Sequence, residues 1–166
     1  MIDIHYDLET GSLRENAAIY SIGAVAVKDG EIVDEFHIRI NPNCYENRGR
    51  DQDNLGWWED NNYEEFSKIS ASDVPLSDAM YAFSDWVDSQ VDFGVRFWQK
   101  RMMDQLWLES ASKTCGVQSP VKFSQVFELC TWFEAKGYQP VGSQKNAHNA
   151  LADARAQAED WIRSNK

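Results

Sequence analysis

Asp7 and Glu9, close to the N-terminus, are the first residues whose types and spacing suggest chemistry. The segment that contains them alternates apolar and polar residues, which is typical of a β-strand. Side chains two positions apart on a strand point to the same face and lie about 6.6 Å apart. Two such carboxylates can share a divalent cation or flank a pair of cations about 3.5–4 Å apart. The other interpretation is a solvated strand end, although strands contain few acidic residues.

His148 and Asp153 form a second candidate pair near the C-terminus. Five residues of an α-helix turn through about 500°, which would leave the two side chains about 140° apart. They can therefore share a site only if His148 precedes the helix and Asp153 lies one turn inside it. Asn149 is a favourable N-cap residue and agrees with this placement. The spacing alone favours a surface histidine and a solvated aspartate.

A third acid, Asp104, follows a short apolar segment that ends at Trp98, and it lies near the start of an expected helix. The helix dipole favours an acidic residue in the first turn by about 0.3–1 kcal/mol. For Asp104 by itself, helix stability is therefore the favoured explanation.

Strands must position the N-terminal pair of acids. The first strand runs through Ile2, Ile4, Tyr6 and Leu8, and residues 18–27 are nearly continuously apolar, as in a buried central strand. A turn at residues 28–30 leads into a third strand over residues 32–40, so the three strands are expected to form an antiparallel meander. A further short strand is expected from Phe93 to Trp98.

Helices are expected to supply the other candidate residues and to cover the sheet. Apolar residues at helical spacing predict helices at about 55–72, 77–90, 102–115, 124–136 and 149–164, with Ser77 as a cap of the second. Three strands followed by helices, a strand and more helices predict a mixed α/β domain.

The composition agrees with one folded domain over residues 1–166. Of the 166 residues 43% are hydrophobic, with few Gly and Pro, which excludes disordered and collagen-like chains. No apolar run reaches the roughly 18 residues that would span a bilayer, and the first residues lack the basic region of a signal peptide. Three separated cysteines form neither a disulfide framework nor a zinc pattern, so a cytoplasmic location is expected.

The net charge of −11 argues at first against a nucleic-acid partner, because such a surface repels phosphate. The acidic residues are concentrated in residues 1–92, whereas basic residues slightly outnumber acidic ones in residues 93–166. A local path for phosphate could be formed by basic residues of this second stretch, namely Lys100, Arg101, Lys113, Lys122, Lys145 and Arg155.

The order of the motifs is more specific than any one of them. A D-x-E pair, a central Asp and a late H-x4-D resemble the DnaQ-like 3′→5′ exonucleases of the DEDDh branch, and more narrowly a small phage and bacterial group allied to exodeoxyribonuclease VIII. The resemblance rests on DLET (7–10), AIYSIGAVAV (18–27), NLGWWEDN (54–61), PLSDAMYAFSDWV (75–87) and HNALADARAQAE (148–159). It implies an RNase H-like α/β fold, a mixed sheet flanked by helices.

The resemblance also implies a site and a reaction. Two Mg²⁺ (or Mn²⁺) ions would be held by Asp7, Glu9, Asp104 and Asp153, and His148 would be the general base. The reaction would be two-metal hydrolysis of single-stranded DNA or RNA from a free 3′ end, releasing nucleoside 5′-monophosphates. Glu9 and the Thr10 amide would bind the terminal 3′-hydroxyl, and Leu13 or a neighbour in its loop would wedge against the last base. Such relatives are commonly dimers, which leaves a homodimer open.

The segment before Asp104 departs from the pattern of the relatives, which usually carry an Asn-Gly pair there. Here it reads Gln-Lys-Arg-Met-Met, so Lys100 and Arg101 become the expected substrate contacts, and Asp88 and Asp92 stay open as alternatives to Asp104. A catalytically impaired module that binds nucleic acid or protein is therefore the alternative function, and an endonuclease on the same fold is a third.

Aromatic residues and one further histidine allow more than one interpretation. Trp57 and Trp58 could stack on bases, but one core residue beside one partly exposed residue, or a dimer contact, is favoured. His5 alternates with apolar residues and is expected to be a hydrogen-bonded structural histidine.

Overall fold

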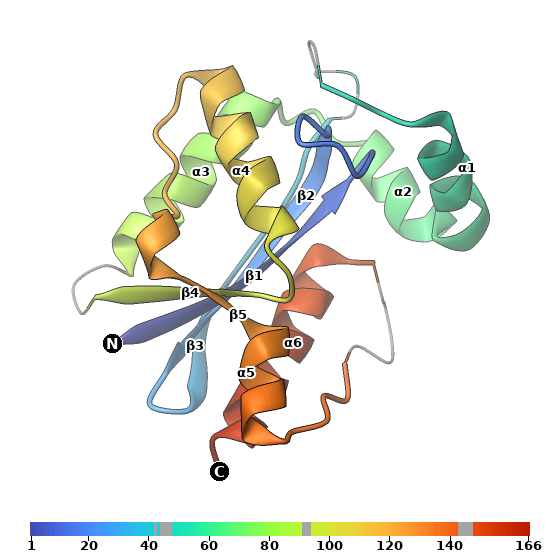
Figure 1. Cartoon of the computed structure of the whole chain (residues 1–166). Helices are drawn as coiled ribbons and strands as arrows, with labels where there is room; N and C mark the ends of the chain where they lie inside the picture. The colour runs from blue at the N-terminus through green and yellow to red at the C-terminus, as the bar shows by residue number, and fades with distance from the viewer. Residues whose placement is uncertain (42, 44–47, 91–93, 143–147) are drawn as a thin grey trace.

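A five-stranded sheet forms the centre of the structure, a computed structural model that describes residues 1–41, 43, 48–90, 94–142 and 148–166 (Figure 1). The strand order is β3-β2-β1-β4-β5. The first three strands are antiparallel neighbours, whereas β4 is parallel to β1 and β5 is parallel to β4. The strands are β1 (Ile2–Thr10), β2 (Ile19–Lys28), β3 (Glu31–Arg39), β4 (Val95–Gln99) and β5 (Val126–Glu128). The predicted meander is confirmed.

The alternation of β1 gives the sheet two different faces. Its apolar residues Ile4, Tyr6 and Leu8 enter the main core, which α3 (Leu76–Ser89) and α4 (Met103–Cys115) cover. The opposite face carries Asp7 and Glu9 and is covered by α6 (Ala150–Ser164), with α5 (Leu129–Lys136) beside it (Figure 1). The period of the strand therefore directs its carboxylates away from the main core.

The single helix expected over residues 55–72 is wrong. Two helices, α1 (Gln52–Asn61) and α2 (Tyr63–Ser70), meet at Asn62, whose φ of −145° and ψ of 44° are not helical. They lie together beyond the end of β1 (Figure 1). None of the helices in the described ranges is long and apolar enough to cross a membrane.

The sequence also missed one strand. Residues 126–128, which lie inside the helix expected over 124–136, form β5, and α5 begins only at Leu129. The Glu128 side chain caps α5 by accepting a hydrogen bond from the Thr131 amide. Helix α3 begins at Leu76, so Ser77 lies inside the helix and is not its cap.

Helix α6 starts directly on the backbone of β2. Gly23 of β2 pairs with Asp7 of β1, and a Cβ atom at Gly23 would lie 2.1 Å from the carbonyl carbon of Ala150. Only a residue without a side chain permits this approach. The first turn of α6 is thereby held beside the acidic end of β1.

Candidate active site

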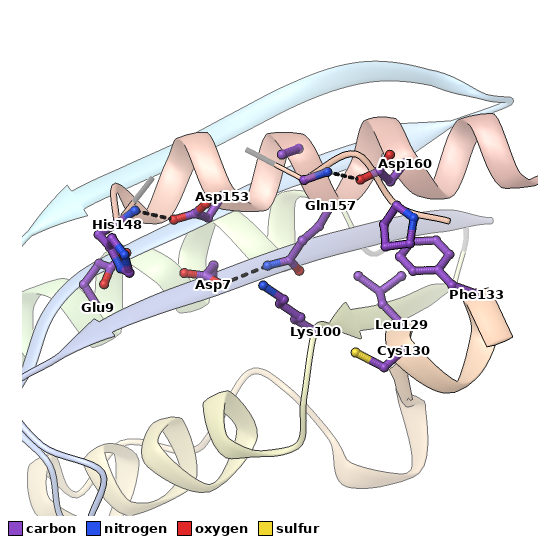
Figure 2. A pocket seen from close by; sticks show the side chains of 13 residues that line it. Asp7, Glu9, Lys100, Leu129, Cys130, Phe133, His148, Asp153, Gln157 and Asp160 are labelled. Atoms are coloured by element: carbon purple, nitrogen blue, oxygen red, sulfur yellow. Dashed lines mark hydrogen bonds between the residues drawn. The ribbon is translucent and has the colours of Figure 1, made fainter. Parts of the chain in front are cut away.

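Three carboxylates from β1 and α6 meet in one group. Asp7, Glu9 and Asp153 each offer an oxygen, and these three atoms lie within 4.8 Å of one another (Figure 2). The two β1 acids share a face, as their spacing predicted. Strand β1 and helix α6 thus combine residues that are almost 150 positions apart in the sequence.

Asp104 lies next to this group at the start of α4. It is buried, and its Oδ1 accepts a hydrogen bond from the Leu8 amide at 3.2 Å. Its charge raises the pKa values of both β1 acids. Of the two alternatives, Asp88 lies exposed on α3, and Asp92 lies outside the described residues.

His148 stands outside α6, as predicted, with Asp153 one turn inside. Its φ of 64° is in the left-handed region, and its amide donates to Asp153 Oδ2 at 2.8 Å (Figure 2). Asn149 is the predicted N-cap, since its Oδ1 accepts from the Ala152 amide at 3.0 Å. The turn before α6 therefore ties the histidine directly to a carboxylate of the group.

Helices α1 and α2 hold His148 from the other side. The Trp57 ring, 37% exposed, packs edge-to-face on the imidazole with centroids 4.5 Å apart. Asn62 Nδ2 donates to the His148 carbonyl at 2.9 Å. Trp58 is buried, so the tryptophan pair is one core and one partly exposed residue, as the sequence favoured. The break between α1 and α2, which the sequence did not reveal, thus supplies a contact to the site.

Burial and repulsion raise the pKa values of Asp7 and Glu9, and burial raises that of Asp104. Burial raises the pKa of Asp7 well above its usual value, and the charges of Asp104, Glu9 and Asp153 raise it further. Burial, Asp153 and Asp104 do the same to the pKa of Glu9. Burial raises the pKa of Asp104 to about 7, although the Leu8 amide and the Lys100 charge oppose the shift. Lowering this repulsion calls for positive charge among the carboxylates.

The donor set fits a hard divalent cation. Every candidate ligand is a carboxylate oxygen, the type that Mg²⁺ and Mn²⁺ prefer. The oxygens already converge, and the raised pKa values show how unfavourable the bare group is when ionised. The residues present therefore suit the cations that the sequence pattern implied.

Asp7, Glu9 and Asp153 line one end of a cleft with a volume of about 490 Å³ (Figure 2). His148 and Lys100 also line it, and Leu129 and Phe133 of α5 form its apolar end. If divalent cations offset the charge of its acidic end, this cleft suits a ligand that combines a phosphate with a ring.

The other expected substrate contacts lie at different distances from the cleft. Arg101 is exposed and does not line this cleft, and Leu13, 79% exposed, lines a separate hollow with Arg14 and residues 51–54. Thr10 is buried next to Glu9, and its hydroxyl donates to the Ser12 carbonyl at 2.9 Å. Of the two basic residues, the structure brings Lys100 alone to the cleft.

The basic path expected on the second half of the chain is partly neutralised. Arg155 pairs with Glu35 and Glu159, and Lys113 pairs with Glu109. Lys145 lies outside the described residues. The basic side chains of Arg155 and Lys113 are therefore less available to a phosphate.

The structure corrects the interpretation of His5. The ring is fully buried and contacts Trp98 and Trp161, but neither nitrogen has a hydrogen-bond partner in the described part of the chain. Burial lowers the pKa of His5 to about 3, so the imidazole is neutral at ordinary pH. It is structural, as expected, but not hydrogen-bonded.

Gln157 is a cleft residue that the sequence did not reveal. Its Nε2 donates to Asp7 Oδ1 at 2.8 Å (Figure 2). The available signal was its position four residues after Asp153, which places both side chains on one face of α6.

Solved structures share this fold across nearly the whole chain. The nuclease domain of 3′hExo, described as a DEDDh family member bound to rAMP, is 13% identical over 98% of this chain and 89% of its own, with a TM-score of 0.63. Exonuclease I of E. coli, with zinc and single-stranded DNA, is 12% identical over 95% of this chain and 38% of its own, with a TM-score of 0.68. Pop2p of S. pombe, in a Mg²⁺- and Mn²⁺-bound form, is 11% identical over 97% of this chain and 81% of its own, with a TM-score of 0.63. At these identities the likeness shows the RNase H-like fold, as predicted.

A family comparison is more specific. No curated protein matches the sequence. The family model described as "3′-5′ exoribonuclease Rv2179c-like domain" matches residues 2–163. Neither this family nor the three solved structures above are exodeoxyribonuclease VIII proteins, so that narrower relation stays a prediction. The chain belongs to the family of Rv2179c-like 3′-5′ exoribonuclease domains and is a nuclease.

Proposed function

We propose that the protein is a metal-dependent exonuclease that shortens single-stranded RNA from a free 3′ end and releases nucleoside 5′-monophosphates. The observation that carries this proposal is the convergence of the Asp7, Glu9 and Asp153 oxygens within 4.8 Å, in a cleft that His148 also lines. The description of the family as exoribonucleases supports RNA as the substrate and the 3′ end as the start.

The four acids would hold two divalent cations, Mg²⁺ or Mn²⁺. Such cations, when bound, lower the pKa of a water molecule and offset charge on a scissile phosphate. Oxygens of Asp7, Glu9 and Asp153 lie within 4.8 Å of one another, and Asp104 adds its charge from the start of α4. Glu9 and the Thr10 amide would also bind the terminal 3′-hydroxyl.

His148 would accept the proton of the attacking water through its imidazole. Its backbone amide is already engaged with Asp153, so the ring is the part left for chemistry. Trp57 and Asn62 restrict where this ring can lie. Lys100, in the same cleft, would attract the phosphate.

The test is a degradation assay on 5′-labelled single-stranded RNA and DNA, with Mg²⁺ or with EDTA. We expect a ladder that shortens from the 3′ end of RNA in Mg²⁺ and no shortening in EDTA. A 3′-phosphate should block the reaction, because the proposed site binds a free 3′-hydroxyl.

His148→Ala is the matched variant for this assay. It should lose roughly 10²–10⁴-fold in kcat while binding Mn²⁺ as the wild type does, because the imidazole is not among the proposed ligands. Nearly full activity of this variant would contradict the general-base role. Internal cuts would favour an endonuclease, absence of any metal-dependent shortening would favour a binding module, and a ladder on DNA alone would overturn the RNA assignment.

A further inference from the structure

Gln157 reaches the acidic group from helix α6. It is 8% exposed, lines the cleft, and donates from Nε2 to Oδ1 of Asp7 at 2.8 Å (Figure 2). Asp7 lies on β1, so this hydrogen bond joins the two elements that build the site.

The donor differs in kind from those of the neighbouring acids. Asp104 accepts from the Leu8 amide, and Asp153 accepts from the His148 amide. Both of those donors belong to the backbone, so their positions are fixed by the fold. Within the described ranges, Gln157 donates to the group from its side chain, so this hydrogen bond can be removed without changing an acid.

Packing alone does not explain an amide at this position. The second polar atom of Gln157, Oε1, is buried and has no hydrogen-bond partner in the described part of the chain. A buried acceptor without a partner is unfavourable, and an apolar side chain of the same length would avoid it. The amide is therefore best explained by what its Nε2 does for Asp7.

A neutral donor also suits this environment better than a charged one. A glutamate at 157 would add a fifth carboxylate to a group in which repulsion already raises the pKa values of Asp7 and Glu9. A lysine would place a fixed positive charge where a cation is needed. An amide orients the Asp7 carboxylate and adds no net charge.

We infer that Gln157 is a positioning residue that fixes the Asp7 carboxylate for a divalent cation and so sets the cation concentration at which the enzyme works. The inference rests on the proposed function, because it assumes that Asp7 binds the cation. Residues that orient metal ligands by hydrogen bonds typically change metal affinity or activity by about 10–100-fold when removed.

The test compares Mn²⁺ binding to the wild type and to Gln157→Met by titration calorimetry, without substrate. Methionine keeps the length of the side chain and a good helix propensity but has no donor. We expect the variant to bind Mn²⁺ at least about tenfold more weakly. The Mg²⁺ concentration for half-maximal RNA degradation should rise by a similar factor, with KM for RNA unchanged at saturating Mg²⁺. Gln118→Met, at an exposed position outside the cleft, is the matched control.

Two further measurements keep the test decisive. The first is thermal unfolding in EDTA, which reports whether Gln157→Met is folded. The second is Mn²⁺ binding to Gln157→Asn, which keeps the amide but withdraws it by one methylene and should therefore also bind Mn²⁺ more weakly. Wild-type affinity in both variants, or a loss of Tm in EDTA with no change in affinity, would overturn the inference. A wild-type protein that binds no Mn²⁺ would instead refute the proposed function.

Discussion

Stability and function place opposite requirements on Asp7. Its carboxylate is half-buried beside three other acids, and one donor, Gln157, opposes the rise in its pKa. Without a cation the fold shifts the equilibrium of Asp7 towards its protonated form, because its pKa is raised, whereas cation binding requires the ionised form. The D-x-E spacing predicted the shared face of Asp7 and Glu9, because the period of a strand is local. It could not predict the contact of Asp7 with Gln157, because this residue lies on a helix 150 positions away.

The metal-free protein should lose stability as the pH rises. A carboxyl with a raised pKa in the folded state binds more protons there than in the unfolded state, so the free energy of unfolding falls with rising pH. The fall starts above the usual carboxyl pKa of about 4 and continues through about 7 for Asp104. The lowered pKa of His5 acts in the opposite sense, but its contribution is complete above about pH 6.5.

The measurement is therefore Tm in EDTA between pH 6.5 and 8.5. Titration through one pKa unit corresponds to about 1.4 kcal/mol, or roughly 3–6 °C for a protein of this size. Asp7→Asn should show a smaller decline and a higher Tm than the wild type at pH 8.5, and Mg²⁺ should remove most of the wild-type decline. A wild-type Tm that stays level or increases over this range would contradict the prediction.

At the scale of elements, the site depends on how closely α6 approaches the sheet. The sequence predicted β1, β2 and the start of α6 well, because periodicity and an N-cap are local signals. It missed β5, whose three residues are too few to show a period, and the break at Asn62. That break is stabilised by a hydrogen bond to His148, 86 residues away, which no local pattern contains.

Gly23→Ala on β2 should therefore disturb the site by displacing the start of α6. Its Cβ would meet the backbone of Ala150 and Leu151 at 2.1 and 2.2 Å, so the first turn of α6 must shift, and Asp153 with it. We expect a loss of about 1–3 kcal/mol in the free energy of unfolding, as for other overpacked positions, together with weaker Mn²⁺ binding.

Gly56→Ala in α1 is the control for this change. A Cβ there meets nothing within 4 Å, and alanine should stabilise the helix by up to about 1 kcal/mol. Chemical denaturation and Mn²⁺ calorimetry on both variants check the expectation. Equal stability and equal Mn²⁺ affinity of the two alanine variants would mean that the position of α6 does not depend on Gly23.

At the scale of the whole molecule, the net charge of −11 no longer argues against a nucleic-acid substrate, since the chain belongs to a nuclease family. Four of its acids are proposed cation ligands, and two bound divalent cations would offset their charge. The expected basic path is nevertheless weaker than it looked, because Arg155 and Lys113 pair with glutamates. A single domain over residues 1–166, a cytoplasmic location and a homodimer stay predictions.

In the described part of the chain Lys100 is the lysine that lines the cleft, so we expect few phosphate contacts, and this sets the salt dependence of RNA binding. Each contact to a single strand contributes a slope of about −0.7 to the logarithm of affinity against the logarithm of salt concentration. Because KM rises as affinity falls, we expect the logarithm of KM for RNA to rise with the logarithm of salt concentration, with a slope of about 1 to 2, at saturating Mg²⁺ between roughly 50 and 300 mM KCl. Lys100→Ala should reduce the slope by about 0.7. Lys113→Ala should leave it unchanged, because Lys113 is paired with Glu109 and does not line the cleft. A steep slope, or an equal effect of the two variants, would mean that RNA is held by a basic surface other than the cleft.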